Sequence, residues 1–65
     1  MSLENKLRFS ELINSLGLNK SQKRELSRFY RNKESFNPDD FYLNQALDSY
    51  NISKEQKDEI KKYFE

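Results

Sequence analysis

Two stretches of this chain align with each other, and that internal repeat constrains the fold more than any other feature. Residues 13–30, INSLGLNKSQKRELSRFY, align without a gap on residues 47–64, LDSYNISKEQKDEIKKYF, at an offset of 34. The identical pairs are Ser15/Ser49, Lys20/Lys54, Gln22/Gln56, Lys23/Lys57 and Glu25/Glu59. Any two capped amphipathic helices share part of such a pattern, but one fixed offset is typical of a duplicated supersecondary unit. We therefore expect two similar halves.

Residues that start and stop helices divide each half in two. Asn19 and Ser53 are each followed three residues later by a glutamine, which is the pattern of a capping box at a helix start. Gly17 is placed to close a helix in the left-handed conformation, and Asn51 takes the matching place in the second half. Each half is therefore predicted to be a helical hairpin.

The start of the second hairpin is predicted from Asn37 and Pro38. Asparagine is a favoured cap, proline suits the first helical position, and Asp39 and Asp40 then face the positive end of the helix dipole. A single glycine and a single proline in 65 residues argue against a turn-rich β fold. The prediction is an all-α, compact four-helix domain built from two similar helical hairpins, approximately 3–32 and 38–64, with helices near 3–16, 19–32, 38–50 and 53–64.

Apolar residues recur at helical spacing and predict one shared core. The expected core residues are Phe9, Leu12, Ile13 and Leu16 on the first helix, Leu26, Phe29 and Tyr30 on the second, Phe41, Leu43, Leu47 and Tyr50 on the third, and Ile60, Tyr63 and Phe64 on the fourth. Leu18 and Ile52 are expected to fill the two turns. A chain of this length forms one domain, 1–65, whose stability amounts to a few kcal/mol.

Charge is unevenly distributed although the net charge is only +1. Residues 20–33 contain Glu25 as their single acid, beside the bases Lys20, Lys23, Arg24, Arg28, Arg31 and Lys33. Residues 34–50 contain acids and no base. On a helix, Lys20, Arg24, Arg28 and Arg31 form one basic stripe. Three interpretations stay open: a solvated face, a face paired with the acidic third helix, or a surface that binds an anionic partner.

Two other sets of residues are candidates for contact with a partner. Leu3 and Leu7 lie on a different stripe of the first helix from its core face. They are expected either to pack on the last helix near Phe64 or to anchor a partner or a second copy of the chain. Tyr42 is the third exposed apolar candidate.

The leading functional prediction is a non-enzymatic protein-binding module, a regulator or inhibitor whose basic helix face meets an acidic patch. Its predicted partner-binding residues are Lys20, Lys23, Arg24, Arg28, Arg31, Leu3, Leu7 and Tyr42. A homodimer is a further prediction. By association with its small size, its lack of cysteine and its asparagine- and lysine-rich composition, the chain is expected to be an accessory protein of a bacterium, plasmid or phage.

The alternative is a DNA- or RNA-binding protein that uses a helix-turn-helix-like first hairpin with a basic second helix. Gly17 would occupy the turn of that motif, with apolar residues at Leu12, Leu16, Leu18 and Leu26. Two positions do not fit: Ile13 is bulky where the helices approach closely, and Lys23 is charged where the second helix should point inward. The near-neutral net charge also disfavours nucleic acid.

Several functional classes are excluded or disfavoured by what the sequence lacks. It contains no cysteine and no histidine, so no cofactor, metal site or catalytic residue is predicted. Glu34, Asp39 and Asp40 lie close in sequence, but they lack the spacing and the glycine of a calcium loop. The first residues do not resemble a signal peptide, and no apolar run could span a membrane. The expected location is therefore cytoplasmic, with no membrane partner.

Overall fold

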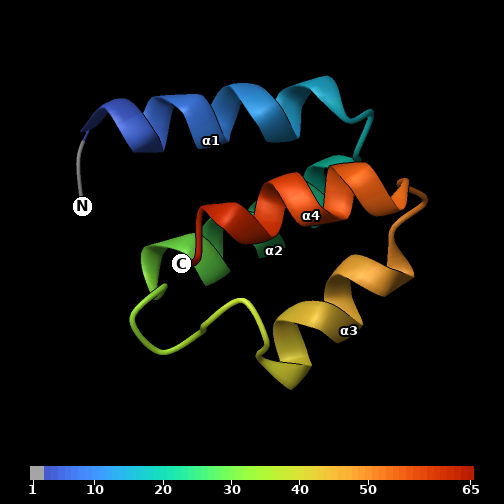
Figure 1. Ribbon diagram of the computed structural model, residues 1–65. Helices are drawn as coiled ribbons and strands as arrows, with labels where there is room; N and C mark the ends of the chain where they lie inside the picture. The colour runs from blue at the N-terminus through green and yellow to red at the C-terminus, as the bar shows by residue number, and fades with distance from the viewer. Residues whose placement is uncertain (1–2) are drawn as a thin grey trace.

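The helices begin where side chains cap free backbone N–H groups. The computed structural model describes residues 3–65, so that the first two residues of the predicted domain lie outside the description. It contains helices α1 (Leu3–Ser15), α2 (Lys20–Arg31), α3 (Phe41–Ser49) and α4 (Lys54–Lys62), and no strand within those residues (Figure 1). The all-α prediction is confirmed.

Both predicted capping boxes are present. The Asn19 side chain accepts a hydrogen bond from the Gln22 backbone N–H at 2.8 Å, and the Gln22 side chain accepts one from Asn19 at 3.1 Å. Ser53 and Gln56 make the same two bonds at 3.1 and 2.9 Å. Because each box satisfies two N–H groups that lack a partner in the helix, α2 and α4 begin at equivalent positions of the repeat.

The two turns differ in how they end their first helix. Gly17 has φ of 71°, as predicted. The matching prediction for Asn51 is wrong, because no residue other than glycine has a positive φ in residues 3–65. Tyr50 instead leaves the helix in an extended conformation, with φ −85° and ψ 151°, and its side chain is buried in the core.

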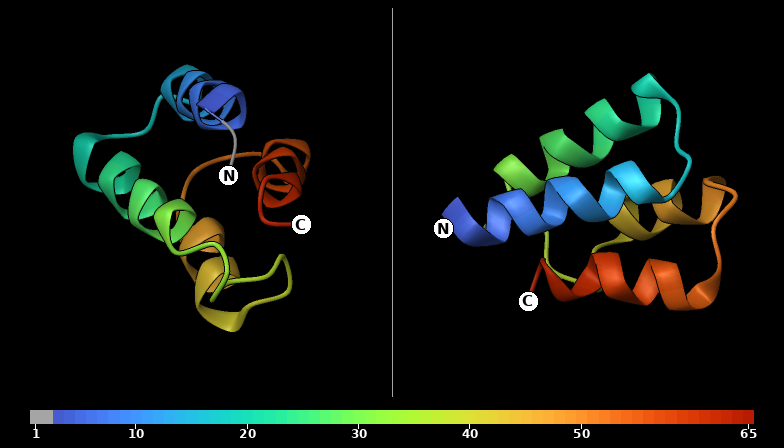
Figure 2. Two further views of the ribbon diagram at one scale, coloured as in Figure 1. Left: turned by 90° about the vertical axis from the view of Figure 1, so that its left-hand side faces the viewer. Right: turned by 90° about the horizontal axis from the view of Figure 1, so that it is seen from above.

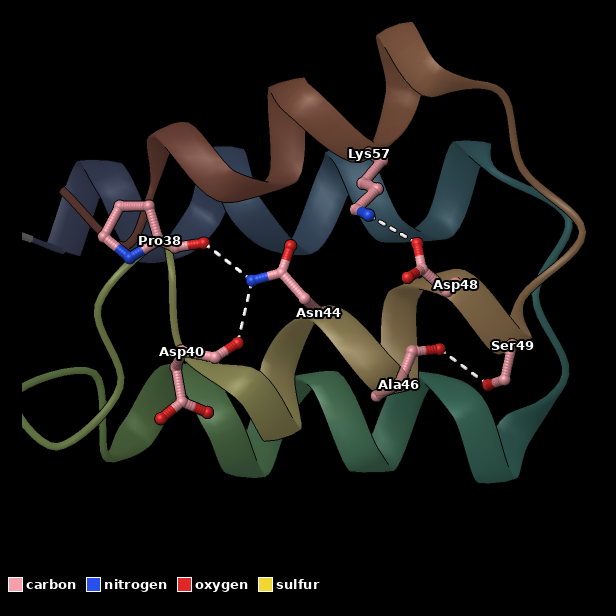
Figure 3. Close-up of polar contacts among 7 residues, drawn as sticks. All are labelled: Pro38, Asp40, Asn44, Ala46, Asp48, Ser49 and Lys57. Carbon is pink, nitrogen blue, oxygen red and sulfur yellow. Dashed lines mark hydrogen bonds and ion pairs between the residues drawn. The ribbon is translucent and has the colours of Figure 1, made fainter.

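The start of α3 is also later than predicted. Asp40, not Asn37, caps the helix by accepting a hydrogen bond from the Leu43 backbone N–H at 3.0 Å. Asn37 accepts from the Asp39 backbone and so closes a local turn. The Asn44 side chain then donates to the carbonyls of Pro38 and Asp40, which holds this turn against the helix (Figure 3). The Asn44 side chain thus restrains the turn from six residues beyond Pro38, a contact that the cap pattern does not show.

One residue assigned to the core is exposed. Phe41 is 68% exposed, so its predicted core position is wrong. It lies about 200° around the helix from Leu43, at 100° per residue, and therefore points away when Leu43 and Leu47 point inward. The remaining predicted core residues are buried or partly buried against one shared cluster.

The two hairpins close over that cluster. Leu26 of α2 and Ile60 of α4, which are equivalent in the repeat, are both 0% exposed. Phe9 stacks on Tyr30 with ring centroids 4.3 Å apart, and the edges of Tyr63 and Phe64 contact this pair. Helix α1 contacts both α2 and α4 (Figure 2), and aromatic residues of α1, of α2 and of the segment directly after α4 meet in the core.

A basic groove between the first two helices

A groove of about 480 Å³ lies between α1 and α2. Its lining residues are Lys6, Phe9 and Ser10 from α1 and Lys23, Arg24, Ser27, Tyr30 and Arg31 from α2. The lining of the groove therefore has four basic side chains, two serine hydroxyls, the hydroxyl of Tyr30 and no acid. The stacked rings of Phe9 and Tyr30 are buried at its base. Positive charges next to the apolar floor of the groove are less well screened than charges in open water. Their attraction for an anion is therefore stronger.

The bases of the groove have no ion-pair partner among the described residues. The ion pairs of residues 3–65 join Arg8 to Glu4 and Lys57 to Asp48. Asp48 is the acid of α3 that forms an ion pair, and it pairs with α4 (Figure 3), not with the basic stripe of α2. The interpretation in which the acidic third helix covers the stripe is therefore not supported by the contacts.

The one acid of α2, Glu25, is exposed and does not line the groove. Glu25 accepts a short hydrogen bond from the hydroxyl of the buried Tyr50, which also lies 3.5 Å from the carbonyl oxygen of Gln22. Burial first, and then the hydrogen bond to Glu25 and its negative charge, raise the pKa of Tyr50 well above its ordinary value. Glu25 is thus bonded to Tyr50 and forms no ion pair with the groove bases within residues 3–65, although it lines a neighbouring hollow together with Arg24.

The hydroxyl groups in the groove are also unengaged. Ser15 and Ser49, elsewhere on the helices, donate to backbone carbonyls one turn earlier, at 2.7 and 2.6 Å. Ser10 and Ser27 make no such bond within residues 3–65. The buried hydroxyl of Tyr30 likewise has no hydrogen-bond partner there, and its pKa is raised by burial and then by nearby Tyr63.

The predicted basic residues fall into two groups. Lys23, Arg24 and Arg31 line the groove, with Lys23 half-buried. Lys20 is exposed at the start of α2 and does not line it. Arg28 is exposed one turn from Arg24 on the same stripe; it does not line the groove and lies beside a second hollow of about 380 Å³. That hollow is lined by Glu25, Arg28, Phe29, Asn32, Ser35 and Phe36.

Sequence reasoning missed the contribution of α1. Lys6 and Ser10 are one turn apart, and they form the wall that faces α2. The i, i+4 spacing of a base and a hydroxyl beside the Phe9 core face was the available signal. It becomes informative only when α2 is known to lie against that side of α1.

The apolar candidates are exposed but lie in two places. Leu3 and Leu7 are 72% and 55% exposed, so the expectation that they pack near Phe64 is wrong. They are not lining residues of the groove, but their helical spacing places them on the same stripe of α1 as Ser10, next to its α1 wall. Tyr42 is 66% exposed beside Phe41 on α3, across the molecule from α1 (Figures 1 and 2). The structure does not bring Tyr42 to the same surface.

Other kinds of site are not found in the described part of the chain. No group of three acidic, histidine or cysteine side chains there could hold a metal ion, and no helix is long and apolar enough to cross a membrane. Comparison of the chain with protein-family models, with curated proteins and with solved structures finds no match. The functional argument therefore depends on the groove itself.

Proposed function

We propose that this chain is a small non-enzymatic binding module that regulates or inhibits an acidic protein partner through its α1–α2 face. The observation that supports this proposal most is the groove lined by four bases without a compensating acid. Positive potential on one patch favours encounter with a negative patch and penalises wrong partners. Leu3 and Leu7, exposed at its border, add the apolar contact that a protein interface uses as an anchor.

Two misfits to the helix-turn-helix motif favour a protein partner over a nucleic acid. Ile13 is bulky and buried where the helices of that motif approach closely, and Lys23 lines the groove where the second helix of the motif should point an apolar residue inward. The net charge of +1 is also small for a domain that binds phosphate backbone.

Fluorescence anisotropy with two labelled probes tests the proposal. The first probe is a helical peptide of about 20 residues, made of glutamates with a leucine at every fourth position, and the second is a DNA duplex of similar length. We expect saturable binding of the peptide and weaker binding of the duplex. A tighter duplex complex, with a log–log salt slope near −3.6 for about four phosphate contacts, would establish the nucleic-acid function instead.

Matched charge reversals locate the contact. Arg24→Glu with Arg31→Glu should abolish peptide binding, because both side chains line the groove. Lys54→Glu with Lys62→Glu changes the net charge equally at exposed positions of α4 and should leave most of the binding intact. Equal loss in the two variants, or no binding by the native chain, would contradict the proposal.

A further inference from the structure

The charges of the groove can be compared with the charges at equivalent positions of the second hairpin. At the same offset of 34, Arg24 corresponds to Asp58, and Arg31, directly after the aligned stretch, corresponds to Glu65. Two of the four groove bases thus have an acid as their counterpart in the second hairpin, while Lys6 lies outside the aligned repeat. The shared helical core does not require positive charge at these positions, since the second hairpin folds with the opposite charge there.

Lys23 shows the same contrast between the hairpins, through the acid next to its counterpart. Lys23 corresponds to Lys57, which forms an ion pair with Asp48. The counterpart of Asp48 is Asn14, which has no charge, and Lys23 has no ion pair within residues 3–65. The second hairpin neutralises its lysine, and the first leaves the equivalent lysine available beside three more bases.

From this contrast we infer that the α1–α2 groove binds a phosphate monoester, borne on a side chain of the protein partner. Like charges around one groove repel each other and lower stability, and an anion of higher charge offsets more of that repulsion. A carboxylate supplies one negative charge, whereas a phosphate monoester supplies about −1.5 to −2 at pH 7 and three acceptor oxygens. This inference rests on the proposed function and specifies the chemistry of that partner.

The donors of the groove match such a group. Ser27 lies one turn from Arg24 and one turn from Arg31, so a hydroxyl donor stands between two guanidinium groups. Guanidinium groups bind phosphate oxygens in pairs of parallel hydrogen bonds. Ser10 and Lys6 supply a hydroxyl and an ammonium from the opposite wall.

The border of the groove favours a phosphorylated protein segment over free phosphate. Leu3 and Leu7 are exposed on the same stripe of α1 as Ser10. An apolar residue near the phosphorylated side chain would cover them, whereas free phosphate would leave them in water. The expected ligand therefore combines a phosphoserine or phosphothreonine with a neighbouring apolar side chain.

Isothermal titration with three peptides tests the inference. The peptides are identical ten-residue segments with leucines beside a central phosphoserine, glutamate or serine, and inorganic phosphate is titrated as a fourth ligand. We expect the phosphoserine peptide to bind about tenfold more tightly than the glutamate peptide and more tightly than inorganic phosphate. Affinity should fall below about pH 6, where the phosphate loses its second charge.

A single substitution tests the groove without removing a base. Asn14→Asp places a carboxylate where the second hairpin has Asp48, and it should lower affinity for the phosphoserine peptide about fivefold by pairing with Lys23. Asn51→Asp adds the same charge at an exposed turn and should change affinity less than about twofold. Circular dichroism checks that both variants stay folded.

The outcomes separate the two proposals. Equal affinity for the phosphoserine and glutamate peptides would overturn the phosphate inference and leave the acidic-partner function standing. No binding of any peptide would overturn both. Inorganic phosphate binding as tightly as the phosphoserine peptide would overturn the assignment to a partner's side chain. Equal effects of Asn14→Asp and Asn51→Asp would overturn the location in the groove.

Discussion

Lys23 in α2 and Lys57 in α4 follow the glutamine of a capping box at equivalent places in the two hairpins, yet their surroundings differ. Lys57 pairs with Asp48 from the preceding helix, whereas Lys23 faces a groove with three other bases and no acid. The buried neighbours of the two lysines are alike, since Leu26 and Ile60 are both 0% exposed. The capping and the buried positions are thus alike in the two hairpins, while their outer faces differ in charge.

If the two hairpins share one core, their equivalent core residues should matter equally. We expect Leu26→Ala and Ile60→Ala each to lower the free energy of unfolding by about 2–4 kcal/mol, because each side chain is fully buried. Urea denaturation followed by circular dichroism should show a single transition in both variants. For a domain this small such a loss can exceed the total stability, so Ile60→Val, at about 0.5–1.5 kcal/mol, is the gentler companion. Two separate transitions would show that the hairpins fold independently.

The buried tyrosines Tyr30 and Tyr50 give a second comparison between the hairpins, because only the Tyr50 hydroxyl forms a hydrogen bond within residues 3–65. Tyr50 donates to Glu25, so Tyr50→Phe should lower the free energy of unfolding by about 1 kcal/mol. The Tyr30 hydroxyl is buried without a partner there, so Tyr30→Phe should leave stability unchanged or raise it by up to about 1 kcal/mol. Thermal and urea unfolding measure both. A loss in Tyr30→Phe as large as in Tyr50→Phe would contradict the difference between the two sites.

The same tyrosines make stability depend on alkaline pH. Burial raises the pKa of both Tyr30 and Tyr50, while an unfolded tyrosine ionises near pH 10. Above about pH 10 the unfolded chain therefore loses protons that the folded chain retains, and stability falls as pH rises towards the folded pKa values. We expect urea midpoints to decline from pH 9 to 11, and to decline less in Tyr50→Phe than in Tyr42→Phe, which removes an exposed hydroxyl. Identical pH profiles would contradict the role of Tyr50.

The local features of the fold were predictable because they depend on neighbours in the chain. A capping box needs only Asn19 and Gln22, or Ser53 and Gln56, three residues apart. The start of α3 was not predictable in this way. The Asn44 side chain donates to the carbonyl of Pro38, six residues earlier, and Asp40 caps the helix in place of Asn37. Phe41 was misplaced because a run of apolar letters does not show which face of the helix points inward.

Only the α2 side of the candidate groove was predictable from the sequence. The sequence by itself determined that α2 has a basic face and a capped amphipathic repeat, because charge and helical periodicity follow from residue order. Only the tertiary structure decided that Lys6 and Ser10 of α1 stand opposite that face, that Glu25 is held by Tyr50, and that Leu3 and Leu7 stay exposed. Those facts depend on how two helices pack across the core, and packing joins residues that no local spacing relates.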